Sequence, residues 1–501
     1  MTAIKRLAGQ TAIYGIPSVL GRILGYLLVP LYTYVFHSGD YGTVSVFYAY
    51  TSFLMVILTY GMETTFFRFN EHEQDKESVF STGMISLIIS SIIFLVVVLT
   101  FSSDVARWID YPDHPEYVRW FAWILALDAI SAIPFASLRA QNRPARFAWI
   151  KMTNISLNIG LNLFFLLLCP FIMRHYAGSI AGRFISTVYR PNWGIEYIFV
   201  SNLIASSVTI VMLIPQITSV KWKIAPDLWK KMVFYAFPLL FAGMAGIVNE
   251  TFDRLLLRYL LPKDIASSEV GIYAACYKIS ILMTIFIQAY RYAAEPFFFA
   301  QAKEKNAKEV YARIMDYFII IVSLIFLVTM LYLDDFILPL LVRNKEYWVG
   351  KGVIPVLMMA NLFLGVYYNL SIWYKLTART SWGAWLSFIG AIITLILNFW
   401  WIPLGSDHLI YGYYGSAWAT FICYGSMMIL SYLIGQIYFP VKYNLPKFAG
   451  YLGLSVLLYV ISLFIVPAHS VLRIGFHTLL LLSYMGIVYY VEKPKLSVLI
   501  K

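Results

Sequence analysis

Charged side chains interrupt the apolar stretches of this sequence at positions where charge is costly. The segment from Tyr14 to Thr33 is apolar enough to cross a bilayer, yet Arg22 lies near its middle. A guanidinium at that depth costs roughly 2.5–3.5 kcal/mol if it faces lipid, so we expect it to face a wet cavity or a partner. The functional interpretation is a site that handles an anion inside the membrane. The alternative is that Arg22 snorkels or pairs with a carboxylate for structure alone.

Further polar and charged side chains lie in the apolar stretches that follow. The basic ones would line a cationic cavity together with Arg22, and they are Lys278, Arg291, Arg68 and Arg254. The others would couple transport to an ion or pair with the cations, and they are Glu63, Asp253, Glu295, Asp128 and Asn249. Structural alternatives stay open for several of them. Arg68 would snorkel, Asp253 would pair with Arg254, and burial would neutralise Lys278.

The composition is that of a protein that crosses the membrane many times. Of 501 residues, 60% are hydrophobic and 13% are charged, with a mean hydropathy of +0.72; soluble domains are nearer half apolar and a quarter charged. The 38 Lys and Arg residues outnumber the 26 Asp and Glu residues. We attribute this excess to cytoplasmic loops that face anionic lipid rather than to nucleic-acid binding. The cysteines lie in apolar runs and indicate neither a disulfide framework nor a metal site.

About 14 apolar segments are long enough to span a bilayer. They cover approximately residues 11–36, 41–67, 79–101, 117–138, 146–173, 196–216, 232–260, 270–300, 313–341, 352–374, 382–403, 412–437, 447–467 and 472–491. Loops after the even-numbered segments are richer in Lys and Arg. By the positive-inside rule, we therefore expect both termini in the cytoplasm. The expected location is the cell inner membrane, which the chain would cross many times. Two outside loops are exceptions, with the basic residues Arg174, Arg183 and Arg190, then Arg343, Lys345 and Lys351.

A weak internal repeat relates the two halves of the chain. The stretch Tyr14-Gly-Ile-Pro17 matches Tyr235-Ala-Phe-Pro238, and Glu63-Thr-Thr-Phe-Phe67 matches Glu295-Pro-Phe-Phe-Phe299. A repeat of six helices keeps its orientation in the membrane, as in transporters built from parallel repeats. We therefore expect three parts, namely a six-helix bundle at residues 1–220, a second at 221–440, and two additional helices with a cytoplasmic tail at 441–501.

The sequence carries no catalytic motif that we can identify. It has no P-loop, no zinc-binding HExxH and no GxSxG, and its loops are short. One outside loop gathers acidic and histidine residues, namely Asp104, Asp110, Asp113, His114 and Glu116. We interpret this loop as solvated, with a membrane glycosyltransferase or polymerase as the alternative. We therefore expect no enzyme, no cofactor and no metal.

Short motifs at the second, eighth and twelfth segments carry a family resemblance. They are Asp40-Tyr-Gly42, Val270-Gly-Ile-Tyr273 and Tyr414-Gly-Ser-Ala-Trp-Ala-Thr420. With them the chain resembles the multidrug/oligosaccharidyl-lipid/polysaccharide exporter superfamily, and more narrowly the bacterial flippases that move O-antigen or capsule repeat units. The resemblance implies two six-helix bundles in parallel pseudo-two-fold repeat plus two C-terminal helices. The implied cargo is a polyprenyl-diphosphate-linked oligosaccharide, moved by alternating access for lipopolysaccharide or capsule synthesis.

Two related families stay open as alternatives. The stretch Gly21-Arg22-Ile-Leu-Gly25 resembles the first helix of the lipid II flippases of peptidoglycan synthesis, and Lys278 stands where those proteins carry a cavity arginine. The second segment departs from that family, because it has Glu63 and Arg68 in place of a Pro-Asn-Leu-Leu-Arg-Arg ending. A multidrug or cation antiporter would instead need a carboxylate in the first helix. The expected partners are the lipid-linked oligosaccharide, the bilayer and polysaccharide polymerase machinery, with no nucleic acid.

Overall fold

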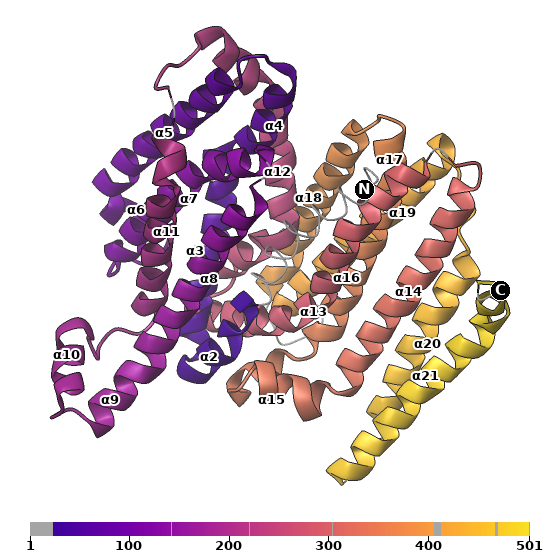
Figure 1. Cartoon of the computed structure of the whole chain (residues 1–501). Helices are drawn as coiled ribbons and strands as arrows, with labels where there is room; N and C mark the ends of the chain where they lie inside the picture. The colour runs from indigo at the N-terminus through magenta and orange to yellow at the C-terminus, as the bar shows by residue number, and fades with distance from the viewer. Residues whose placement is uncertain are drawn as a thin grey trace. The chain divides into compact units, whose positions relative to one another are not determined.

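The computed structural model describes residues 24–499, except 142, 220, 303, 405–411 and 466–468 (Figure 1). Arg22 and the beginning of the first expected segment lie outside these residues. Throughout the described part the chain forms helices and no strand. The prediction of an all-α protein is confirmed.

Thirteen helices in the described ranges are long and apolar enough to cross a membrane. They coincide with the second to the fourteenth segments expected from the sequence. The first segment is represented by the apolar helix Leu24–Val35, which is only its described end. The chain is therefore a multi-pass membrane protein.

The chain divides into two compact units, Met1–Gly271 and Ile272–Lys501. The long helix α13 (Lys263–Gln301) begins in the first unit and continues into the second. The other helices of the first unit are α2 (Leu28–Val35), α3 (Ser38–Thr59), α4 (Met62–His72), α5 (Lys76–Thr100), α6 (Ser102–Trp108), α7 (Pro115–Ala140), α8 (Pro144–Leu163), η1 (Phe164–Leu168), α9 (Cys169–His175), α10 (Ile180–Val188), α11 (Glu196–Ile217) and α12 (Pro226–Leu260). The expected three-part division at residues 220 and 440 stays a prediction.

Helix α7 is the centre of the first unit. It packs against α5 and α11, while α11 also packs against α8 and α3 packs against α12. Buried aromatic rings join three of these helices, because Phe121 of α7 stacks on Phe47 of α3 at 5.0 Å and meets Phe199 of α11 edge-on at 4.7 Å. Such pairs add about 0.5–1.5 kcal/mol each beyond the area that they bury. Proline at the first position, as in Pro115 and Pro226, starts α7 and α12 without loss of a helical hydrogen bond.

The second expected segment is broken at Tyr60 and Gly61. Both residues are left-handed, with φ of 34° and 74°, and the break separates α3 from α4. A Cβ on Gly61 would lie 2.8 Å from the Cβ of Leu239 on α12, so only glycine allows α12 to approach this turn. The break redirects α4, the helix that carries Glu63 and Arg68.

Helices α3 and α13 cross at their N-terminal ends with backbone in contact. A Cβ on Gly42 would overlap the Ser267 carbonyl oxygen, and a Cβ on Gly271 would overlap the Ser38 carbonyl oxygen. The hydroxyls of Ser38 and Ser268 share a hydrogen bond of 2.5 Å. Each helix thus presents Ser-x-x-x-Gly to the other, a small-residue pattern that lets membrane helices approach closely.

The second unit contains the remaining membrane-spanning helices. They and the short connecting helices are α14 (Ala307–Leu331), η2 (Leu333–Ile337), α15 (Leu338–Leu341), η3 (Lys345–Gly350), α16 (Val353–Leu370), α17 (Ile372–Leu376), α18 (Ser381–Trp401), η4 (Ile402–Leu404), α19 (Gly412–Tyr438), α20 (Leu445–Phe464) and α21 (Ser470–Leu499). Helix α19 packs against α16 and α18, and α20 packs against α14. Arg473 of α21 forms an ion pair with the buried carboxylate of Asp335 in η2. This pair ties the last helix to the rest of the unit.

Candidate functional site

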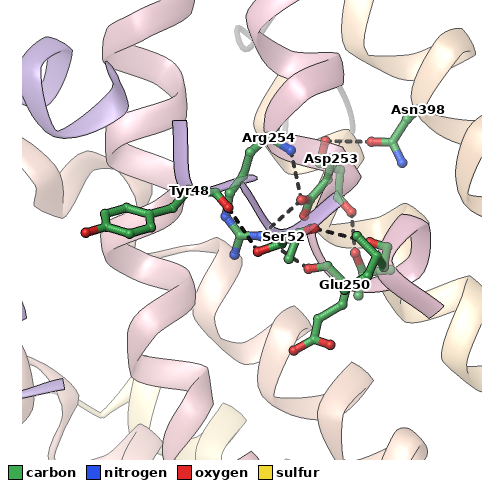
Figure 2. Close-up of polar contacts among 10 residues, drawn as sticks. Tyr48, Ser52, Glu250, Asp253, Arg254 and Asn398 are labelled. Carbon is green, nitrogen blue, oxygen red and sulfur yellow. Dashed lines mark hydrogen bonds and ion pairs between the residues drawn. The ribbon is translucent and has the colours of Figure 1, made fainter. Parts of the chain in front are cut away.

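The most deeply buried charges of the first unit lie on α12. Asp253 and Arg254 are both buried, as is Asn249 one turn earlier. The Arg254 guanidinium donates to the carbonyl oxygen of Glu250 at 3.2 Å and pairs with the Asp253 carboxylate at 3.4 Å. Figure 2 shows Glu250, Asp253 and Arg254 together with Tyr48 and Ser52 of α3, the helix that packs against α12. The pairing of Asp253 with Arg254, an open alternative from the sequence, is present in the structure.

A second buried arginine follows one turn later on α12. The Arg258 guanidinium donates to the Ser267 hydroxyl at 3.0 Å and to the Asp110 carbonyl oxygen at 3.3 Å. It lies over the Tyr111 ring, 5.0 Å from the centroid, and its Nε has no hydrogen-bond partner among the described residues. Sequence reasoning missed Arg258 because a basic residue at the end of a span resembles a snorkelling side chain. Its spacing of four residues from Arg254, which puts both on one helix face, is the signal that could have identified it.

The charges of α4 have partners that the sequence did not indicate. Glu63 forms an ion pair with Arg139 at the end of α7, a residue that is not among the cations selected from the sequence. Arg139 also lies over the Phe67 ring at 4.9 Å. Arg68 is exposed and stacks on the Tyr235 ring of α12, 4.2 Å from the centroid. An exposed guanidinium held against an aromatic ring keeps its charge available to an anion.

The second unit contains a matching arrangement at the end of α13. Glu295 forms an ion pair with Lys375 of α17 at 2.7 Å, and this lysine is again not among the cations selected from the sequence. Arg291 lies over the ring of Tyr368, 3.8 Å from its centroid. A cavity of about 20 Å³ lies among these side chains, which is room for one water molecule.

The Glu63–Arg139 and Glu295–Lys375 pairs occupy equivalent places in the expected repeat. In each half, a glutamate near the end of the second helix binds a cation at the end of the fourth. These side chains are partly exposed, and ion pairs of that kind contribute about 0–1 kcal/mol. Glu63 and Glu295 thus both form ion pairs, and their role in transport stays a prediction.

Three further residues are candidates from the sequence, namely Asp128, Lys278 and Arg22. Asp128 is half-buried on α7 and interacts electrostatically with Lys151 of α8, whose ammonium lies 4.3 Å from the Phe135 ring centroid. Lys278 is half-buried on α13. Arg22 lies outside the described residues, so its place at the centre of a cationic cavity stays a prediction.

The acidic loop before α7 makes ion pairs within the loop region and with the beginning of α13. Asp110 pairs with Lys263 at 2.6 Å, and His114 pairs with Glu116 at 2.9 Å. Among the residues that the structure describes, no group of histidine, cysteine and acidic side chains could hold a metal ion. The loop pairs fit the interpretation of a solvated segment.

The fold is similar to that of several solved membrane transporters. The lipid II flippase MurJ in an inward closed conformation has a TM-score of 0.67 at 13% identity, covering 95% of this chain and 98% of that chain. An inward-facing multidrug resistance MATE family transporter of the MOP superfamily has a TM-score of 0.61 at 13% identity, covering 85% and 94%. The MATE transporter VcmN of Vibrio cholerae, in mutant form, has a TM-score of 0.58 at 14% identity, covering 87% and 98%. The fold is that of MOP-superfamily transporters.

A family model adds the narrower assignment. The model described as polysaccharide biosynthesis protein matches residues 7–301, and the chain belongs to this family. The polysaccharide family expected from the sequence is thereby confirmed. No curated protein matches the chain.

Proposed function

We propose that this protein is a flippase that translocates polyprenyl-diphosphate-linked oligosaccharide repeat units across the cytoplasmic membrane for O-antigen, lipopolysaccharide or capsule synthesis. The observation that carries the proposal is the match to the polysaccharide biosynthesis family in a chain with a MOP transporter fold. Buried and aromatic-stacked cations inside membrane-spanning helices support it. Such a protein needs no catalytic site and no cofactor.

The cargo explains why basic side chains lie at membrane depth. A diphosphate cannot enter hydrocarbon unaided, and guanidinium groups bind phosphate oxygens through two parallel hydrogen bonds. The cations that would act are Arg22, Lys278, Arg291, Arg68 and Arg254. Arg68 and Arg291 are the best placed to bind an anion, because each lies on a tyrosine ring and forms no ion pair within the described part of the chain. The polyprenyl chain stays in the bilayer while the head group crosses.

Alternating access supplies the transport cycle in this proposal. The two parallel repeats rock about the bound head group, with both termini in the cytoplasm. Glu63, Glu295 and Asp253 pair with cations, and the membrane potential drives the anion outward. A potential of 100 mV changes the free energy of each elementary charge that crosses the membrane by about 2.3 kcal/mol. Asp128 and Asn249 remain the candidates for ion coupling if a gradient is used.

A lipid II-type precursor is the second candidate cargo. The observation in its favour is the likeness in fold to MurJ over 95% of this chain. Vesicles that contain the purified protein distinguish the two when they are loaded with polyprenyl-diphosphate oligosaccharide or with lipid II. We expect exposure of the oligosaccharide lipid at the opposite face and little exposure of lipid II. Exposure of lipid II alone would replace the proposal with the peptidoglycan alternative.

A further inference from the structure

The basic loop after the fifth membrane span has no role in the proposed transport cycle. Residues 169–195 contain three arginines, Arg174, Arg183 and Arg190, and neither Asp nor Glu. All three arginines are exposed. They depart from the positive-inside pattern, because this loop follows an odd-numbered span. We expect an outside loop with basic but no acidic residues to bind an anionic partner.

Helix α10, at the middle of this loop, is amphipathic. Ile180, Phe184 and Val188 follow one another at intervals of four residues, and they are 90%, 64% and 46% exposed. Ile185, on the neighbouring side of the helix, is buried, and Arg183 and Ser186 lie on the polar side. An exposed apolar stripe beside a basic face is the pattern of a helix that lies in a membrane interface.

The structure fixes how α10 is attached. The Ser179 hydroxyl accepts a hydrogen bond of 3.1 Å from the amide of Gly182 and caps the helix, and a Cβ on Gly182 would overlap the Tyr176 carbonyl oxygen. After the helix, the Tyr197 hydroxyl bonds both the amide and the carbonyl of Arg190, at 2.5 and 3.2 Å. Figure 1 shows α9 and α10 as a helical hairpin at one end of the unit. The apolar stripe is thus presented by a packed element.

The length of the preceding span puts this hairpin at the membrane surface. The continuous helix Pro144–His175 has 32 residues, which is about 48 Å at 1.5 Å per residue and close to the roughly 40–45 Å of a bilayer with its head groups. Its exposed apolar side chains continue to Leu168 and Phe171 in the last turns. The exposed face of the span therefore extends to the level at which α10 begins.

We propose that α10 is an interfacial helix that docks on the lipid bilayer at the end of α9 and binds anionic phospholipid head groups. Ile180, Phe184 and Val188 enter the boundary of the acyl chains, and Arg174 and Arg183 bind the phosphates above it. Residues 169–195 contain basic but no acidic side chains, and this charge is complementary to anionic phospholipid head groups. The contact holds one end of the first unit at the membrane surface, independently of which cargo the protein moves.

A fluorophore on α10 tests this proposal in the full-length protein. Phe184→Cys is labelled with an environment-sensitive dye after the three native cysteines are replaced, and Ser186→Cys on the polar side is the matched control. The protein is placed in nanodiscs of phosphatidylcholine with or without phosphatidylglycerol, each with spin-labelled lipid. We expect quenching by lipid to be at least twofold stronger at position 184 than at 186, and stronger with phosphatidylglycerol.

The arginines are tested in the same assay. The double variant Arg174→Gln, Arg183→Gln should lose the preference for phosphatidylglycerol and keep the quenching difference between the two positions. Equal quenching at 184 and 186 would overturn the interfacial helix. A dye at 184 that neither lipid nor water reaches would also overturn it, because it would indicate a protein partner. Equal quenching with both lipids in the unsubstituted protein would overturn the anionic binding. None of these results depends on transport activity.

Discussion

At the scale of single residues, the arginines of α12 show how the protein accommodates buried positive charge. The Arg254 guanidinium pairs with the Asp253 carboxylate and donates a hydrogen bond to a main-chain carbonyl of its own helix. Arg258 uses a hydroxyl, a carbonyl and an aromatic ring, with no carboxylate among the contacts described here. Basic side chains satisfied by neutral groups retain their charge, and that charge can attract an anionic head group.

Removal of the predicted cavity cations should stop transport. Arg22→Ala and Lys278→Ala are expected to abolish export of the polysaccharide, because each removes a charge that offsets the diphosphate, while the variants still insert in the membrane. Arg22→Lys should retain activity only if a point charge suffices. Export is measured by complementation at native expression, with Lys305→Ala, an exposed loop residue, as the control. Full complementation by both alanine variants would contradict the cationic cavity.

The Glu63–Arg139 pair should behave as a weak structural contact. Glu63→Gln and Arg139→Gln are each expected to lower the stability by about 0.2–1 kcal/mol, the range for exposed ion pairs, and the double variant should cost no more than either single one. Apparent melting temperatures in detergent give this comparison, and the exchanged pair Glu63→Arg with Arg139→Glu is the control. Loss of transport in Glu63→Gln without loss of stability would instead assign Glu63 to ion coupling.

At the scale of the helices, two backbone features position the charged groups. The left-handed turn at Tyr60 and Gly61 redirects the chain between α3 and α4, which brings Glu63 to Arg139 and Arg68 to Tyr235. The glycine crossing of α3 and α13 brings together the N-terminal ends of the second and eighth spans. Both features depend on residues without a side chain at the point of contact.

Gly61→Ala should destabilise the protein through this turn. A left-handed residue with a Cβ costs about 1–2 kcal/mol, and the new Cβ would also press on the Leu239 side chain at 2.8 Å. Gly246→Ala is the matched control, because α12 leaves open space around that position and alanine favours a helix by about 1 kcal/mol. We expect a lower apparent melting temperature for the first variant and an unchanged or higher one for the second. A Gly61→Ala protein as stable as the parent would show that the turn tolerates a side chain.

The sequence predicted the helices well and the contacts between charges poorly. Hydropathy over about 20 residues identifies a span locally, and the spans from Ser38 to Lys493 lie where they were expected. The pairing of Glu63 with Arg139 joins residues 76 positions apart, and such a pairing depends on how α4 and α7 pack. The break at Gly61 was missed for a related reason, since an isolated glycine in an apolar run gives no sign that a neighbouring helix needs the space.

At the scale of the whole molecule, the alternation of basic and neutral loops predicts the membrane topology, and this prediction can be tested. Both termini and the loop from Lys303 to Arg313 are expected in the cytoplasm. Reporter fusions at Lys501 and within this loop should give the cytoplasmic signal, and a fusion within residues 177–179 should give the opposite one. A fusion at Lys501 that reports from outside would mean that one span has been miscounted.

The central claim is that the protein moves an anionic lipid-linked sugar across the membrane, and reconstituted vesicles test it most directly. A potential is applied without ion gradients, then a pH or sodium gradient without potential, and exposure of polyprenyl-diphosphate oligosaccharide is followed at the far face. The account predicts exposure that depends on the protein, accelerates with a potential negative on the side of entry, and falls to the background of empty vesicles in Lys278→Ala. Vesicles with protein that expose the lipid no faster than empty vesicles, under a potential or under either gradient, would contradict it.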